Sequence, residues 1–89
     1  MKIVINRKFG GFSVSKEIAK ELGLVDEWTL NRADARLIEA VIKDPKRASG
    51  EFASLAVVEI PDKATDWEIT EYDGAEGITY VMGGKLYHI

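Results

Sequence analysis

Four carboxylates lie close together in the C-terminal half of the chain: Glu68, Glu71, Asp73 and Glu76. Clustered carboxylate oxygens are the ligands that hard cations such as Mg²⁺ and Ca²⁺ prefer, and paired carboxylates can serve as general acid and base. The spacing does not match an EF-hand loop, which needs acids at alternate positions, a central glycine and a closing glutamate. Because side chains alternate along a strand, Glu68 would point away from Glu71 and Asp73. We therefore predict a solvated acidic edge that holds no metal and contributes no catalytic residue.

A second group of residues combines positive charge with aromatic rings. Its members are Arg7, Lys8, Phe9 and Phe12, extended by Lys46 and Arg47 if the chain folds these two nearby. Rings that stack on bases, together with cations that meet phosphates, are typical of proteins that bind single-stranded nucleic acid. Most nucleic-acid-binding domains are basic overall, whereas this chain has a net charge of −3. Packing of the two phenylalanines in the core or at its rim is therefore the favoured interpretation, with nucleic-acid binding as the alternative.

A glycine pair, Gly10-Gly11, lies between a predicted strand and a predicted helix. Backbone N–H groups at such a place can hold a phosphate, but the segment matches neither the Walker pattern nor G-x-G-x-x-G. A tight turn between the two elements explains it better. The single histidine, His88, has no candidate nucleophile beside it in the sequence, and the chain has no cysteine. Disulfides, thiolate zinc sites, iron–sulfur clusters and cysteine nucleophiles are therefore excluded.

Two helices follow from the pattern of caps and apolar residues. The first is predicted over Lys16–Leu22, with Ser13 or Ser15 as its N-cap and Gly23 as its C-terminal stop. The second is predicted from about Ala33 to Lys43, where apolar residues recur at the spacing of a core-facing helix.

Five strands are predicted from runs rich in valine and isoleucine and from turn signals at Asp73-Gly74 and Gly83-Gly84. The first strand is nearly all apolar, so we expect both of its faces to be covered. The second strand is expected to pair with the first and to form a hairpin with the third. The predicted strands are Lys2–Asn6, Leu55–Ile60, Asp66–Tyr72, Gly77–Met82 and Lys85–Ile89.

These elements predict one α+β domain over residues 1–89, in the order β-α-α-β-β-β-β, with two helices packed on a mostly antiparallel sheet of about five strands. Two cores would leave each half of an 89-residue chain too small to fold alone. We expect Trp28 and Trp67 to pack in this core, because a small domain needs large apolar groups. No apolar run approaches the roughly 20 residues that a membrane helix needs.

Charge divides unevenly between the two halves of the chain. Residues 1–47 contain ten basic and seven acidic residues, a balance of +3, whereas residues 48–89 contain two basic and eight acidic residues, a balance of −6. Such an asymmetry is typical either of a solvated acidic surface or of an acidic face that meets a basic partner.

Three segments together resemble a family of small uncharacterised proteins carried by phages and prophages of Gram-positive bacteria. They are KIVIN with the following GGFSVS, then LAVVEIPD, then WEITEYDGAE. The likeness extends from Met1 to about Glu76. The last residues, 77–89, differ from many members of that family, which end in a more basic, helical-looking tail. The resemblance implies a phage or prophage context and no catalytic activity.

We therefore expect a non-enzymatic accessory protein, cytoplasmic in a bacterial host cell, that needs no cofactor and binds a host protein through an acidic face. The chain has no recognisable catalytic set, so an enzyme is the last of the hypotheses. The alternative is a small nucleic-acid binder that uses the loop from Arg7 to Phe12. The chain is expected to be a monomer or a homodimer, the latter through strand Lys85–Ile89. The residues of the expected acidic face are Glu59, Asp62, Glu68, Glu71, Asp73 and Glu76.

Overall fold

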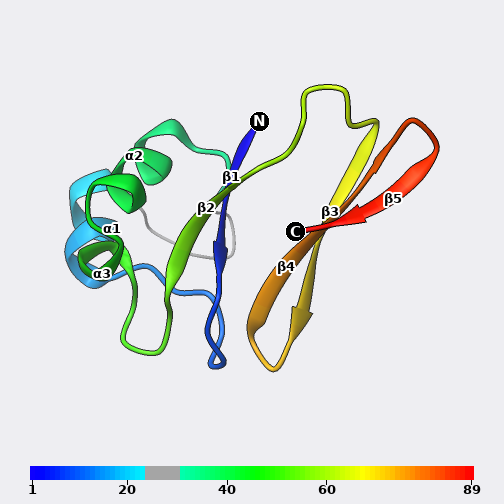
Figure 1. Ribbon diagram of the computed structural model, residues 1–89. Coiled ribbons are helices and arrows are strands. Elements are labelled where there is room, and N and C mark those ends of the chain that lie inside the picture. The colour runs from blue at the N-terminus through cyan, green and yellow to red at the C-terminus, as the bar shows by residue number, and fades with distance from the viewer. Residues whose placement is uncertain (24–30) are drawn as a thin grey trace.

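The protein is built in three layers, seen in a computed structural model that describes residues 1–23 and 31–89 (Figure 1). Helices form the first layer, a two-stranded sheet the second and a three-stranded sheet the third. The strands are β1 (Lys2–Asn6), β2 (Leu55–Glu59), β3 (Asp66–Tyr72), β4 (Ala75–Met82) and β5 (Lys85–His88), and the helices are α1 (Lys16–Leu22), α2 (Ala35–Lys43) and α3 (Pro45–Ala48).

The middle layer explains why the first strand is so apolar. β1 pairs antiparallel with β2, in a register that sets Val4 opposite Val57. Because side chains alternate along a strand, Val4 faces the helices whereas Ile3 and Ile5 face the three-stranded sheet, and all three are buried. The prediction that both faces of this strand are covered is therefore confirmed, as is its pairing with the second strand.

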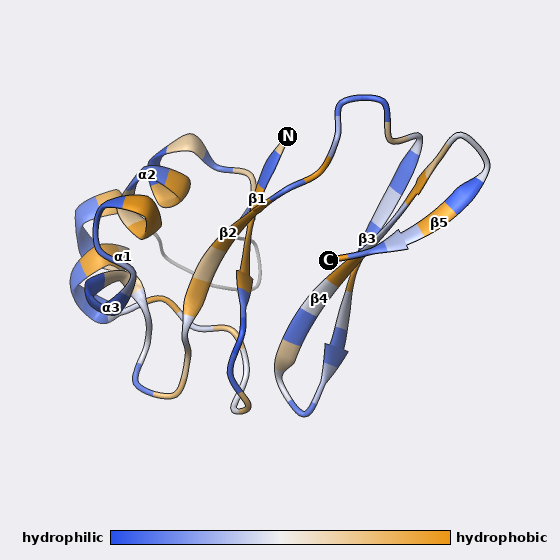
Figure 2. Cartoon of the chain, in the orientation of Figure 1, coloured by the Kyte–Doolittle hydropathy of each residue, from blue (hydrophilic) through white to orange (hydrophobic). Residues whose placement is uncertain are grey.

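Each face of the middle layer has its own core. On the helical side, Val4 and Leu55 pack with Ile18 of α1 and with Leu37 and Val41 of α2. Figure 2 shows how apolar residues concentrate in β1, in β2 and on the helices.

On the other side of the middle layer, Ile3, Ile5, Val58 and Ile60 pack against Ile78 of β4. The three-stranded sheet is thus attached to the body of the protein mainly through contacts between β1 and β4. Its opposite face is covered by no other element among the described residues.

Capping residues fix where the helices begin and end. Ser15 accepts a hydrogen bond from the Ile18 amide at the start of α1, and Gly23 ends the helix in the left-handed region at φ 68°. α2 begins at Ala35, two residues later than predicted, because Asp34 takes an extended conformation and accepts hydrogen bonds from the backbone amides of Arg36 and Leu37.

The third layer corrects one predicted pairing. Asp66–Tyr72 does not form a hairpin with the second strand; it pairs with β4, and β4 pairs with β5. The reason is local, because the two-residue turn at Asp73-Gly74 has positive φ at both positions and favours a tight hairpin. The predicted turn at Gly83-Gly84 is confirmed, and β5 pairs within its own chain.

The fold class is therefore confirmed as a single α+β unit with five antiparallel strands, divided between two sheets. Trp67 lies on β3 with 37% of its surface exposed, so it is not the core residue that was expected, and Trp28 falls outside the described residues. None of the described helices is long and apolar enough to cross a membrane.

The helical core predicts a large effect for one substitution on α2. Leu37 is fully buried, whereas Ile42 on the same helix is 58% exposed. Leu37→Ala should lower the free energy of unfolding by about 2–5 kcal/mol, because it removes buried methyl groups and leaves a cavity. Urea denaturation measures this loss. Ile42→Ala is the control and should change the unfolding free energy by less than about 1 kcal/mol; equal effects of the two would contradict the assigned core.

The α2 cap predicts a dependence of stability on pH. Hydrogen bonds from the Arg36 side chain, and then from the Arg36 amide, hold the pKa of Asp34 below its usual value of 3.8. A carboxyl group whose pKa is lowered by folding stabilises the protein above its unfolded pKa, and this contribution is lost as the pH falls through the folded pKa. Wild type should therefore be more stable than Asp34→Asn at pH 7, on the order of 0.5 kcal/mol. Denaturation at pH 7 and at about pH 2 should show that the difference in unfolding free energy between wild type and Asp34→Asn decreases at the lower pH. A difference of unchanged size would contradict the lowered pKa of Asp34.

Candidate functional site

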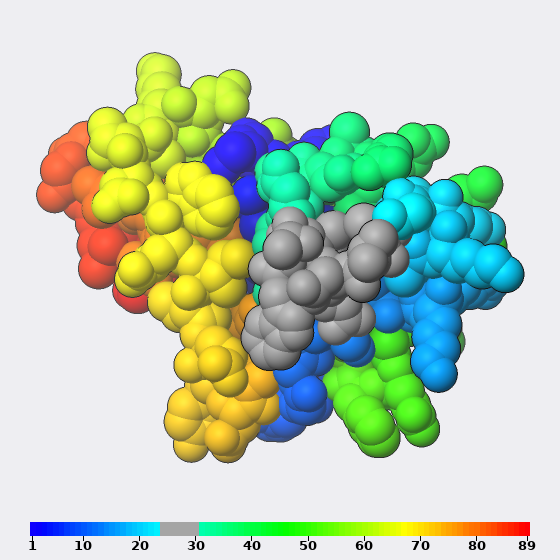
Figure 3. Space-filling model, turned by 180° about the vertical axis from the view of Figure 1, so that it is seen from behind, coloured from blue at the N-terminus to red at the C-terminus, as the bar shows by residue number. Residues whose placement is uncertain are grey.

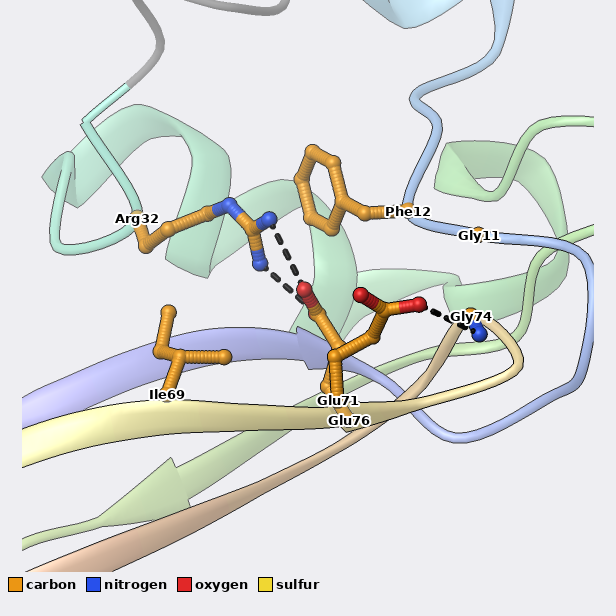
Figure 4. Close-up of a pocket in the computed structure, with 7 residues that line it drawn as sticks. All are labelled: Gly11, Phe12, Arg32, Ile69, Glu71, Gly74 and Glu76. Carbon is orange, nitrogen blue, oxygen red and sulfur yellow. Dashed lines mark hydrogen bonds and ion pairs between the residues drawn. The ribbon is translucent and has the colours of Figure 1, made fainter.

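A cavity of about 450 Å³ lies where the loop after β1 meets the hairpin of β3 and β4 (Figure 4). Phe12 and Arg32 lie on one side; the Glu76 carboxylate points toward Arg32, whereas the Glu71 carboxylate points toward Gly74. The lining residues are Gly11, Phe12, Arg32, Ile69, Glu71, Gly74 and Glu76.

The cavity is dominated by an ion pair between Arg32 and Glu76. The guanidinium binds the carboxylate in a bidentate manner, at 2.8 and 3.0 Å, and only 8% of the Glu76 side chain is exposed. One of the same guanidinium nitrogens donates to the Val4 carbonyl oxygen, and the carbon of the guanidinium lies 3.5 Å from the centre of the Phe12 ring. Bidentate geometry and a covering ring are typical of a partly buried arginine that holds elements together.

Asn6 extends this ion pair into the middle layer. Its backbone amide donates to Glu76 at 2.8 Å. Its side chain is fully buried and makes four hydrogen bonds: Nδ2 donates to the carbonyl oxygens of Lys8 and Gly74, and Oδ1 accepts from the amides of Lys8 and Ser54. All the hydrogen-bonding capacity that an asparagine amide normally uses is therefore satisfied. We call Asn6, Arg32 and Glu76 the polar clamp.

The charged groups of the cavity are engaged by other groups of the protein. Arg32 and Glu76 neutralise each other, and one oxygen of Glu71 accepts the Gly74 amide at 2.8 Å. Of the described residues, those that line the cavity carry no hydroxyl, thiol or imidazole group. In residues 1–23 and 31–89, no three His, Cys, Asp or Glu side chains lie close enough together to hold a metal ion.

The six residues of the expected acidic face lie in different places. Glu76 belongs to the polar clamp, and Glu71 lies at the cavity beside it. Glu68 lies on the face of β3 opposite to Ile69, which packs inward, so Glu68 faces outward. Asp73 is exposed in the turn between β3 and β4.

The other two acidic residues lie away from β3. Glu59, the last residue of β2, is exposed on the strand face that also carries Val57, which is the helical side. Asp62 is exposed in the connection to β3, 3.2 Å from the amino group of Met1. Asp66, which the sequence did not single out, lies on the outward face of β3 with Glu68.

The basic and aromatic residues of the alternative hypothesis are also divided. Arg7, Lys8 and Phe9 stay together and exposed after β1. Phe12 is partly buried under Arg32 and packs against the helical core. The expectation that both phenylalanines pack in the core or at its rim therefore holds for Phe12 and is wrong for Phe9, which is 64% exposed.

The two basic residues that would extend that group lie on α3. Arg47 forms ion pairs with Glu17 and Glu21 of α1. Lys46 is exposed and lines a hollow together with Glu51, Ala53 and Ser54.

Sequence reasoning missed four residues of these surfaces. Asn6 and Arg32 complete the polar clamp, and Phe52 and Tyr72 expose large rings near Phe9. A polar residue closing an otherwise apolar strand is a signal that could have drawn attention to Asn6. The other three depend on contacts between segments that are distant in the sequence, and no local pattern indicates them.

Comparison with known proteins adds no relative, since no protein-family model, no curated protein and no solved structure matches the chain. The likeness to small phage and prophage proteins remains a prediction.

The polar clamp predicts an unequal response to two Glu→Gln substitutions. Glu76→Gln leaves Arg32 without its charged partner in a mostly buried place, so the unfolding free energy should fall by about 2–4 kcal/mol. Glu17→Gln removes one exposed partner of Arg47 and should cost less than about 1 kcal/mol. Both values can be measured by urea denaturation at pH 7. The clamp would be disproved as a stabilising element if the two substitutions had equal effects.

Proposed function

We propose that this protein is a non-enzymatic binding domain that recognises a basic protein surface through the acidic outward face and edge of β3. The observation that carries the proposal is the way the charges are paired. On the helical side, Arg36 pairs with Asp34, and Arg47 pairs with Glu17 and Glu21. Within the described part of the chain, no basic side chain pairs with the acidic residues of β3 and its turn, which are Asp66, Glu68, Glu71 and Asp73.

The exposure of β3 supports this role. β3 forms one edge of the three-stranded sheet, and every residue of it except Ile69 is exposed. Asp66 and Glu68 lie side by side on its outward face, because they are two residues apart in a strand. Unpaired acidic groups on an open surface attract a basic partner over a distance and raise the rate of association, more than they raise affinity. The partner would therefore be a protein with a basic face.

The resemblance to phage and prophage proteins suggests where such a partner would be found. A phage or prophage context would place the protein inside a bacterium, and the partner would then be a protein of that host. Nucleic-acid enzymes and defence proteins are candidates, because proteins that bind nucleic acid carry basic surfaces.

Charge reversal on β3 tests the proposal. Glu68→Lys/Thr70→Lys changes two exposed residues of the outward face without touching the capped turn at Asp73-Gly74. Capture of a host protein from bacterial lysate by the tagged domain should fall at least about tenfold in this variant, since like charges now face each other. The captured protein is quantified by mass spectrometry, after nuclease treatment and at physiological salt.

The matched control places the same change of charge on the helical side. Glu39→Lys/Ala35→Lys changes two exposed residues of α2 by the same amount of charge and should leave capture unchanged. Equal losses in the two variants would mean that only net charge matters. Capture that disappears with nuclease, or that survives reversal on β3, would overturn the proposal.

A further inference from the structure

Three large aromatic side chains from distant parts of the sequence are exposed at one end of the molecule. Phe9 and Phe52 are each 64% exposed and Tyr72 is 74% exposed. The rings of Phe9 and Tyr72 lie 6.4 Å apart at an angle of 68°. The segment with Phe52 lies against the same loop, since a Cβ built on Gly10 would be 2.9 Å from the Phe52 carbonyl oxygen. We call Phe9, Phe52 and Tyr72 the aromatic end.

Figures 1 and 3 both show these three segments meeting along one end of the molecule. The loop after β1 lies between the turn of β3 and β4 and the loop before β2. The three segments therefore form one continuous surface.

Close backbone packing holds this surface in place. The Gly10 amide donates to the Asp73 carbonyl oxygen at 3.1 Å. Gly74 lies so close to the loop that a Cβ on it would come within 2.1 Å of the Gly11 nitrogen. The buried side-chain amide of Asn6 donates hydrogen bonds to the carbonyl oxygens of both Lys8 and Gly74 and so links the two segments. The rings are thus carried by loops that are tied together, which lowers the entropy lost when a ligand orders them.

Two basic residues adjoin the aromatic end in the sequence, and the guanidinium of one of them, Arg7, donates to the Glu76 carbonyl oxygen at 3.4 Å. Arg7 and Lys8 are exposed directly before Phe9, and neither forms an ion pair with a carboxylate within the described residues. Lys46 lines the hollow beside the loop that carries Phe52. Cations beside exposed rings are the combination that binds the backbone and the bases of single strands.

Two carboxylates oppose this charge at the margins. Glu51 precedes Phe52, and Asp73 follows Tyr72. They would weaken the attraction for phosphates, although carboxylates can also accept hydrogen bonds from the amino groups of bases. Their position makes a direct test possible, because a phosphate ligand and a basic protein respond to them in opposite ways.

We propose that the aromatic end binds single-stranded nucleic acid, with bases stacked on Phe9, Phe52 and Tyr72 and with phosphates held by Arg7 and Lys8. This activity differs from protein binding by Asp66 and Glu68, although Tyr72 lies at the end of the same face of β3. Stacking tolerates any base, so we expect weak sequence preference, a clear preference for single strands over duplexes, and binding that weakens with salt.

Fluorescence anisotropy with a labelled oligothymidine tests the proposal. The wild-type protein should bind in the micromolar range at low salt, and the logarithm of its affinity should fall with the logarithm of salt with a slope of about −1.4, as for two phosphate contacts. Phe9→Leu and Tyr72→Leu keep an apolar side chain but remove the ring, so each should weaken binding by about tenfold. Leu86→Ala changes an exposed apolar residue of β5 and should leave binding unchanged.

Removing the two carboxylates tests whether phosphates bind beside them. Glu51→Gln/Asp73→Asn should tighten oligothymidine binding several-fold, since it removes like charge beside the phosphates, and asparagine tolerates the positive φ at position 73. The proposal fails if wild type does not bind at low salt, if a duplex binds as well as the single strand, or if the Leu variants bind like wild type. Weaker binding of oligothymidine by Glu51→Gln/Asp73→Asn would also overturn it, because the loss of negative charge beside bound phosphates cannot weaken their attraction.

Discussion

A single buried asparagine is the constraint on which the arrangement of the layers depends. A buried amide without partners would cost several kcal/mol, and here each of the four side-chain hydrogen bonds of Asn6 goes to a different backbone group. Those groups belong to the loop after β1, the residue before β2 and the turn between β3 and β4. Satisfying Asn6 therefore fixes the relative positions of three segments. The backbone amide of Asn6 also donates to the Glu76 carboxylate, which in turn binds Arg32, so these two residues are held in the same network.

The two proposed binding surfaces lie at the outside of this arrangement. The polar clamp neutralises Glu76, so the charge left on the three-stranded sheet is carried by residues that face solvent, such as Glu68. The same clamp holds Lys8 against Gly74, which brings the rings of Phe9 and Tyr72 together. The buried residues of the polar clamp thus fix the positions of the exposed residues on both surfaces. No residue of the clamp has to contact a ligand in either proposal.

The sequence was sufficient to predict what local interactions decide. The bounds of Lys2–Asn6, Lys16–Leu22 and Asp66–Tyr72 were predicted as observed, because apolar alternation and capping residues act over a few positions. The predicted pairing of Asp66–Tyr72 with the second strand was wrong. The strand pairs with β4 instead, because a two-residue turn favours a hairpin more strongly than the longer connection to the second strand does. Ion pairing across the layers and the meeting of Phe9 with Tyr72 join residues more than forty positions apart, and no local pattern encodes such contacts.

Hydrogen exchange of side-chain amides tests the central role of Asn6 most directly. The chain has two asparagines and no glutamine, so two pairs of side-chain amide signals are expected by NMR, one from buried Asn6 and one from exposed Asn31. If the clamp organises the fold, the Asn6 amide protons should exchange about as slowly as the backbone amides of β1, through global unfolding, whereas those of Asn31 should exchange at nearly the rate of an unfolded chain. Fast exchange at Asn6, similar to that at Asn31, would contradict the account.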